Sequence, residues 1–187
     1  MTRVKPKLIV HFGAGDWIPR KHYPPIRANE THLVYDPDPE LPKKYAEFKD
    51  SQVGKLPLTL IPRGAQNTGL RRDSVDVIHI HNVFSAPSAR SVREDLLKEA
   101  ERILKPGGII YMLHWNTPEY MPKEELLQMA NMRGLKIEFP FSLNKTELRE
   151  LNKSELDSLR EISEFPKLLA KLVTPGAYLA KLTKKQG

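Results

Sequence analysis

Short apolar runs, separated by polar and turn-rich stretches, are the main pattern along this chain. Runs rich in Val, Ile and Leu and bounded by Gly, Pro or Asp are typical of buried strands. Seven such runs predict strands, at Leu8–Phe12, Leu33–Tyr35, Leu58–Ile61, Val75–Val83, Ile109–Leu113, Leu135–Phe141 and Tyr178–Leu182.

Apolar residues recur at helical spacing between the later runs. Ser91 and Glu94 match a capping box, and the apolar positions after them predict a helix that reaches Leu104. A second helix is predicted to begin with Pro122 as its first residue and to end at a cap formed by Gly134. Because strands alternate with helices, we expect an α/β fold with a mainly parallel sheet and helices on both faces.

The length of 187 residues suits one domain. We therefore expect residues 1–187 to form a single domain. Leucines at helical spacing between the sixth and seventh runs predict a helical insertion at 143–174. We expect this insertion to cover the substrate side of the pocket as a lid, while packing on the sheet edge or on a second copy stays open.

Composition excludes several kinds of chemistry. The chain has no cysteine, which rules out disulfides, thiolate catalysis and cysteine metal sites. No apolar run reaches the roughly 18 residues of a membrane span, which predicts a cytoplasmic protein without membrane contact. The net charge of +7 is spread thinly, and only Lys181, Lys184 and Lys185 form a basic tail. A nucleic-acid partner stays open, although a solvated surface is the simpler interpretation.

Polar residues follow four of the predicted strands, and the carboxyl ends of parallel strands are where such sheets bind ligands. They are Gly13, Ala14 and Gly15 after the first strand, Asp36 after the second, Gln66 after the third, and His81 and Asn82 after the fourth. Glycines let a ligand approach the backbone, and a carboxylate can accept hydrogen bonds from two ribose hydroxyls. This combination favours a nucleoside, although a tight structural turn would also explain the glycines.

The region after the glycines narrows the choice of nucleoside. A dinucleotide needs a third close glycine and a helix start for its pyrophosphate, but Ile18 and several prolines stand there. S-Adenosylmethionine carries no phosphate, so a glycine turn without a strong helix start remains adequate for it.

Several histidines lie where they could take part in chemistry. His79 and His81 share one face of the fourth strand, but two histidines alone make a weak metal site, so no metal is expected. His81 is the candidate general base because it lies nearer the carboxyl end, and His79 is expected to be a hydrogen-bonded core residue. We expect His32 at the surface. His114 and Trp115 end the fifth strand, where they would line a substrate pocket or simply pack.

Three segments, in this order, resemble the class I S-adenosylmethionine-dependent methyltransferases, in particular the small type-11 group. They are Leu8–Gly15, Asp73–Phe84 and Leu97–Ile110, and the last contains the Lys105-Pro-Gly-Gly108 turn. The resemblance implies a Rossmann-like methyltransferase sheet of seven strands, mostly parallel with an antiparallel last strand.

The same resemblance implies roles for the residues at the strand ends. Gly13, Ala14 and Gly15 would line the methionine part of S-adenosylmethionine, and Asp36 would hold its ribose. The turn that contains Gln66 would flank the adenine, with the Gln66 amide as a hydrogen-bond acceptor. His81 and Asn82 would face the cofactor or the substrate.

We therefore predict methyl transfer from S-adenosylmethionine to a small-molecule acceptor. No Asn-Pro-Pro-Tyr-type motif follows the fourth strand, which disfavours methylation of an exocyclic amine of a nucleic-acid base. Two alternatives stay open: an RNA or DNA methyltransferase, and a non-catalytic binding or regulatory protein with the same fold and a decayed pocket. The sequence does not determine the oligomeric state.

Overall fold

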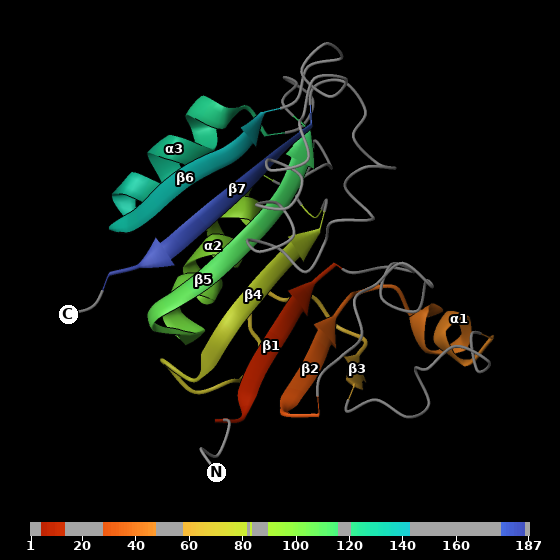
Figure 1. Cartoon of the computed structure of the whole chain (residues 1–187). Coiled ribbons are helices and arrows are strands. Elements are labelled where there is room, and N and C mark those ends of the chain that lie inside the picture. The colour runs from red at the N-terminus through yellow and green to blue at the C-terminus, as the bar shows by residue number, and fades with distance from the viewer. Residues whose placement is uncertain are drawn as a thin grey trace, which may run out of the picture.

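A computed structural model describes residues 5–13, 28–47, 58–81, 83, 90–115, 121–142 and 177–185. Within them, one seven-stranded sheet runs in the order β3-β2-β1-β4-β5-β7-β6 (Figure 1). The strands are β1 (Lys7–Phe12), β2 (Glu30–Tyr35), β3 (Leu58–Ile61), β4 (Val75–His81), β5 (Leu104–Trp115), β6 (Leu135–Ser142) and β7 (Ala177–Lys184). Every predicted strand is present.

Strand direction follows the prediction. β3, β2, β1, β4 and β5 are parallel to their neighbours, whereas β7 is inserted between β5 and β6 and runs antiparallel to both. The order reverses between β1 and β4, because the chain builds outward to β3 from β1 and then returns to the other side of β1. The carboxyl ends beside this reversal are where open parallel sheets bind ligands.

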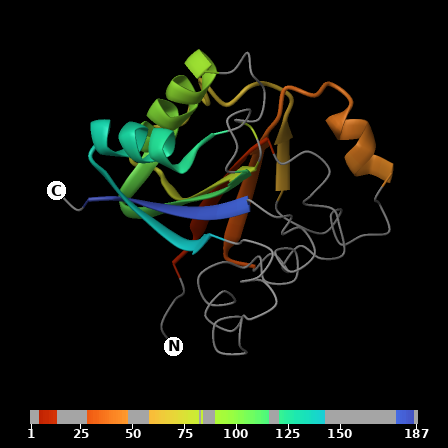
Figure 2. The ribbon, with the colours of Figure 1, turned by 90° about the horizontal axis from the view of Figure 1, so that it is seen from above.

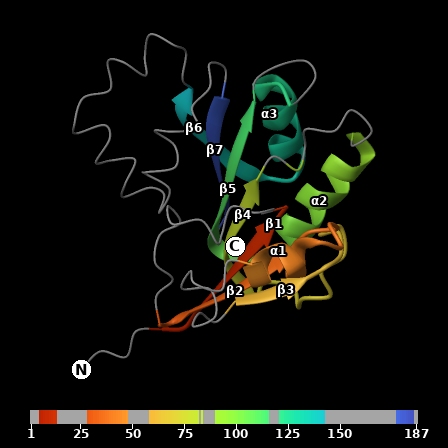
Figure 3. The ribbon, with the colours of Figure 1, turned by 90° about the vertical axis from the view of Figure 1, so that its right-hand side faces the viewer.

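Three helices lie in the described residues: α1 (Leu41–Glu47), α2 (Arg90–Ile103) and α3 (Lys123–Met132). Figures 2 and 3 show α2 and α3 side by side on one face of the sheet. Their buried residues join the main core, which includes Val10, Ile78 and Leu97. The predicted start of α3 is wrong by one residue, because Pro122 has the extended ψ of 148° and precedes the helix.

The short helix α1, which the sequence pattern did not predict, covers the other face. Its Leu41 and Tyr45 form a small cluster with Val34 of β2 and with Leu58 and Leu60 of β3. Alternate residues of a strand point to opposite faces, and the neighbours Tyr35 and Ile61 belong to the main core instead. The prediction of helices on both faces is therefore confirmed.

The Lys105–Gly108 turn lies inside β5, which therefore begins at Leu104 rather than at the predicted Ile109. Leu104 pairs with Val75, and pairing then shifts so that Ile109 pairs with Val77. Gly107 has a φ of +77°, and a Cβ at Gly108 would lie 2.9 Å from the carbonyl oxygen of Lys105. These glycines allow β5 to accommodate the extra residues between Leu104 and Ile109 as a local irregularity.

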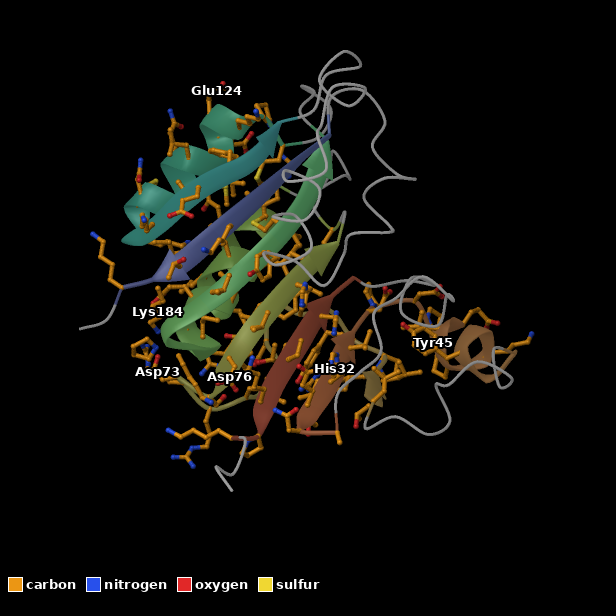
Figure 4. The ribbon with its side chains drawn as sticks, viewed as in Figure 1. His32, Tyr45, Asp73, Asp76, Glu124 and Lys184 are labelled. Atoms are coloured by element: carbon orange, nitrogen blue, oxygen red, sulfur yellow. The ribbon has the colours of Figure 1, made fainter. Side chains whose placement is uncertain are left out.

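Ion pairs hold the opposite, amino edge of the sheet. Lys184 donates to the Oδ1 atom of Asp73 at 2.6 Å and to two backbone carbonyls at the end of α2 and the start of β5 (Figure 4). Lys105 binds Asp76 at 2.7 Å, and Asp76 also accepts from the N–H of Leu8. These contacts link the last strand to the first half of the sheet.

No helix in the described part of the chain is long and apolar enough to cross a membrane. The predicted helical insertion at 143–174 lies outside the described residues.

Candidate active site

The glycine turn begins at the carboxyl end of β1. Gly13 has a φ of +66°, a left-handed backbone conformation that favours glycine. Its N–H donates to the carbonyl oxygen of Tyr35, the last residue of β2, at 2.8 Å. The start of the turn is thereby fixed against β2. Ala14 and Gly15 lie outside the described residues.

Asp36 lies beside this turn. Phe12 pairs with Tyr35 in the parallel register, so the residues that follow them, Gly13 and Asp36, are neighbours at the sheet edge. Asp36 is 8% exposed, and its Oδ1 atom accepts a hydrogen bond from the N–H of Asp38 at 2.9 Å. This local turn orients a buried carboxylate next to the glycine.

Thr68 anchors the loop that follows β3. Its N–H and hydroxyl both donate to the Oε1 atom of Glu99 on α2, at 2.9 and 2.5 Å. Its carbonyl oxygen accepts from the Tyr35 hydroxyl at 2.9 Å and from the Arg63 guanidinium. Arg102 completes the arrangement by donating to Glu99 and to the carbonyl of Leu70. We call this set the Thr68 anchor.

The ionised carboxylate of Glu99 stabilises the Thr68 anchor. Burial alone would raise the pKa of Glu99, but the hydrogen bonds from Arg102 and Thr68 outweigh it and lower that pKa below its usual value. Glu99 therefore stays ionised, and its carboxylate makes charge-assisted hydrogen bonds. The sequence pattern identified α2 but gave no signal for this contact.

Gln66 lies in the loop that the anchor holds. Its side chain is exposed and folds over Gly64, where a Cβ would come within 2.2 Å of the Gln66 Oε1 atom. A side chain at position 64 would displace the Gln66 amide. The loop thus presents an amide at the same edge as Asp36, whose N–H bonds the carbonyl of Ile61 at the end of β3.

The remaining candidates follow or end β4 and β5. His81 pairs with Leu113, and His114 and Trp115 pair with Tyr178 and Ala177 of β7. The backbone therefore brings these positions to the same edge as Gly13. Their side chains, and Asn82 altogether, lie outside the described residues.

An unpredicted row of rings crosses the middle of the sheet, and we call it the histidine row. His32 on β2, His11 on β1, His79 on β4 and Tyr111 on β5 stack in sequence, with centroid distances of 5.2, 5.0 and 5.6 Å. The three histidines are at most 7% exposed. His79 is buried as predicted, whereas the prediction that His32 lies at the surface is wrong, because β2 begins at Glu30 and includes it.

At the β2 end of the row, the two histidines share a hydrogen bond and a carboxylate lies nearby. The His11 Nε2 and His32 Nδ1 atoms are 2.9 Å apart, and the His32 Nε2 atom lies 3.7 Å from a carboxylate oxygen of Glu30. Burial lowers the pKa of His32, and Glu30 partly opposes that shift. In the described part of the chain, no three His, Cys, Asp or Glu residues converge as metal ligands.

Comparison with protein families decides the identity. The methyltransferase domain family matches residues 10–112, which include the second half of β1, Asp36, the Thr68 anchor and the Lys105–Gly108 turn. The chain belongs to this family. It is an S-adenosylmethionine-dependent methyltransferase, and no curated protein matches it in sequence.

Solved structures share the fold of this methyltransferase. An S-adenosylmethionine-dependent methyltransferase from Methanosarcina mazei is 11% identical, with a TM-score of 0.62 over 98% of this chain and 95% of that one. Phosphoethanolamine N-methyltransferase 2 from Haemonchus contortus, in complex with S-adenosyl-L-methionine, is 13% identical, with a TM-score of 0.58 over 97% of this chain and 49% of that one.

The fold alone does not fix the reaction. The [4+2]-cyclase SpnF is 13% identical and reaches a TM-score of 0.64 over 100% of this chain and 77% of that one. The substrate of the present methyltransferase must therefore be argued from its own residues.

Proposed function

We propose that this methyltransferase transfers the methyl group of S-adenosylmethionine to a small-molecule acceptor at the carboxyl edge of its sheet. One observation carries the proposal: a left-handed glycine and a buried, oriented carboxylate are neighbours at the ends of β1 and β2. Both stand beside the point where the strand order reverses.

The residues present fit the cofactor. Gly13 has no Cβ, so the ligand can approach the backbone closely there. Asp36 is buried and held by its own turn, which suits a carboxylate that accepts hydrogen bonds from the two ribose hydroxyls. Gln66 supplies an amide oxygen for the adenine amino group. Ala14, Gly15 and Asn82 complete the proposed cofactor contacts.

Methyl transfer requires few catalytic groups from the protein beyond these cofactor contacts. The sulfonium of S-adenosylmethionine already activates the methyl carbon for displacement. Positioning the acceptor in line with that carbon therefore supplies much of the rate. His81 is our candidate base for the acceptor proton, and His114 and Trp115 are our candidates for the pocket wall.

Charge placement supports a small molecule over a nucleic acid. The predicted basic tail is largely neutralised within the fold, because Lys181 lies 3.6 Å from Glu138 and Lys184 binds Asp73. Exposed Lys7, Arg71 and Arg72 lie at the amino edge, opposite the proposed site, whereas exposed Arg63 follows β3 at the carboxyl edge and donates to the carbonyl of Thr68. The fold similarity to the Haemonchus contortus phosphoethanolamine N-methyltransferase makes small amines the first acceptors to test.

Calorimetric titration with S-adenosylhomocysteine tests the cofactor site. We expect Asp36→Asn to weaken binding about 10- to 100-fold, because hydrogen bonds to a charged group contribute about 1.5–3 kcal/mol. Asp95→Asn, on an exposed position of α2, is the matched control and should bind like the wild type. If the wild type does not bind S-adenosylhomocysteine, the proposed cofactor site is wrong.

Methyl transfer identifies the acceptor class. Radiolabelled S-adenosylmethionine is offered with a panel of small amines and alcohols, and separately with total RNA and with DNA. We expect label in a small molecule. Label that appears only in RNA or DNA would replace the small-molecule proposal with a nucleic-acid methyltransferase.

A further inference from the structure

The histidine row is an unusual feature for the centre of a parallel sheet. Such strands are buried on both faces and usually carry continuous apolar residues. Here His11 and His79 are direct register partners on the two strands that flank the order reversal, and both are buried. Three titratable rings in the core of a methyltransferase therefore call for a role.

At the hydrogen-bonded end of the row, the position of the Glu30 carboxylate favours one set of tautomers. A carboxylate accepts hydrogen bonds, so Glu30 favours a proton on the Nε2 atom of His32. The Nδ1 atom of His32 then accepts from the Nε2–H of His11 at 2.9 Å. This arrangement makes the Nδ1 atom of His11 the basic atom of that ring.

Charges on neighbouring rings of the row would repel one another. Neighbouring rings are 5.0–5.2 Å apart, so a second imidazolium is opposed by the first. Among the described residues, the charged and titratable groups along the row are Glu30 and His32 on β2, His79 on β4, Tyr111 on β5, Lys7 on β1, which pairs with Glu30 in register, and Lys181 on β7, which pairs with Tyr111. Lys181 lies 3.6 Å from Glu138 of β6, so its charge is largely offset. Within the part of the chain that the structure describes, the Glu30 carboxylate lies 3.7 Å from the His32 ring.

The row lies close to the proposed cofactor turn. His11 is two residues before Gly13, which limits the distance between their Cα atoms to about 7 Å. S-Adenosylmethionine and S-adenosylhomocysteine share the adenosine, the ammonium group and the carboxylate, but only the first has a positive sulfur. An imidazolium at His11 would therefore repel one ligand more than the other.

We propose that the histidine row is a proton acceptor coupled to the cofactor's sulfonium charge. The row is neutral while S-adenosylmethionine is bound, and in mildly acidic solution it takes up a proton when S-adenosylhomocysteine takes its place. Acid then favours the demethylated product over the cofactor. This inference rests on the proposed cofactor site at Gly13 and Asp36.

Titration calorimetry of both ligands at pH 7.5 and pH 5.5 tests the coupling. Unit charges about 10 Å apart, at an effective dielectric constant near 20, change a binding constant roughly tenfold, so we expect the ratio of the two dissociation constants to change by about that factor. S-Adenosylmethionine binding near pH 6 should release protons, measured from buffers of different ionisation enthalpy, and S-adenosylhomocysteine binding should release fewer.

Variants locate the effect in the row. Glu30→Gln keeps the side-chain shape but removes the charge, so the pH at which the ratio changes should move lower. The matched control is Glu40→Gln, on the exposed turn before α1, which should leave the ratio at its wild-type value. Histidine ¹⁵N spectra of the wild-type protein give a readout that needs no variant: His11 or His32 should titrate at higher pH with S-adenosylhomocysteine than with S-adenosylmethionine.

The outcomes separate this inference from the proposed function. If neither ligand binds at either pH, the cofactor site itself is wrong. If both bind and their ratio is the same at both pH values, or the row titrates identically with both ligands, the coupling is overturned and the cofactor site stands. A pH-dependent ratio that Glu30→Gln leaves unchanged, in a variant that folds, would also overturn the assignment to the row.

Discussion

The backbone angle of Gly13 bears on both the fold and the proposed cofactor site. At a φ of +66°, a residue with a Cβ is strained by about 1–2 kcal/mol. We expect Gly13→Ala to lower the free energy of unfolding by about 1 kcal/mol, and to weaken S-adenosylhomocysteine binding because the proposed site needs close approach of the ligand to this backbone. Urea unfolding and calorimetric titration measure the two effects.

A second glycine separates backbone strain from ligand contact. Gly134, after α3, has the same φ of +66°, and a Cβ there would meet nothing within 4 Å. Gly134→Ala should therefore reduce stability by a similar amount and leave ligand binding unchanged. Equal loss of binding in the two variants would contradict a direct role for the Gly13 turn.

Single residues also mark the limit of prediction from the sequence. Gly13 and Asp36 were predicted because their positions after apolar runs place them at strand ends. His11 and His32 gave no such signal, since a strand pattern predicts burial but not which side chains meet across the sheet. The start of β2 was also missed, because Glu30 and Thr31 are polar and do not continue the apolar run. The prediction therefore placed His32 at the surface.

At the scale of elements, α2 supports the loop after β3 as well as covering the sheet. Glu99→Gln keeps the shape of the side chain but weakens the charge-assisted hydrogen bonds from Thr68 and Arg102. We expect this variant to lower the free energy of unfolding by about 1–3 kcal/mol and to weaken S-adenosylhomocysteine binding, because the loop carries Gln66.

The same helix supplies the control. Glu94→Gln, at an exposed position of α2, should change neither quantity. A Glu99→Gln variant that loses stability but binds S-adenosylhomocysteine like the wild type would show that the Thr68 anchor is structural only. Thr68→Ser keeps both donors to Glu99, so this variant should bind S-adenosylhomocysteine like the wild type.

Elements were predictable to different degrees. All seven strands and the helices α2 and α3 follow from apolar periodicity and turn residues. The helix α1 was missed because Asp36-Pro-Asp-Pro39 reads as a turn and only seven residues follow in the helix. The start of β5 was misplaced because Pro106 and two glycines usually end a strand, whereas here they form an irregularity within one.

For the whole molecule, we keep the proposal of a single domain whose residues 143–174 form a lid. Hydrogen exchange measures it: with S-adenosylhomocysteine and an acceptor bound, amides in 143–174 should gain protection together with those near Gly13. Gain near Gly13 alone would remove the lid and leave packing or self-association as the purpose of the segment.

The buried histidines also predict how the stability of the whole molecule depends on pH. Burial lowers the pKa of His32 from the ordinary value of 6.5, so the unfolded chain binds a proton more readily than the folded protein does. The contribution of neutral His32 to stability is complete above pH 6.5 and is lost as the pH falls towards the folded pKa. Glu99, whose pKa is lowered from 4.5, adds a further loss only at more acid pH.

Urea unfolding of the ligand-free protein at pH 7.5, 6.5 and 5.5 checks this window. We expect the free energy of unfolding to fall between pH 6.5 and 5.5, where the carboxylate of Glu99 is still ionised. His32→Gln should start from a lower stability at pH 7.5, because it loses the ring contact with His11, and should show a shallower decline. A free energy that stays constant from pH 7.5 to 5.5 in the wild type would contradict this prediction, because it would mean that the histidines titrate equally in the folded and unfolded chains.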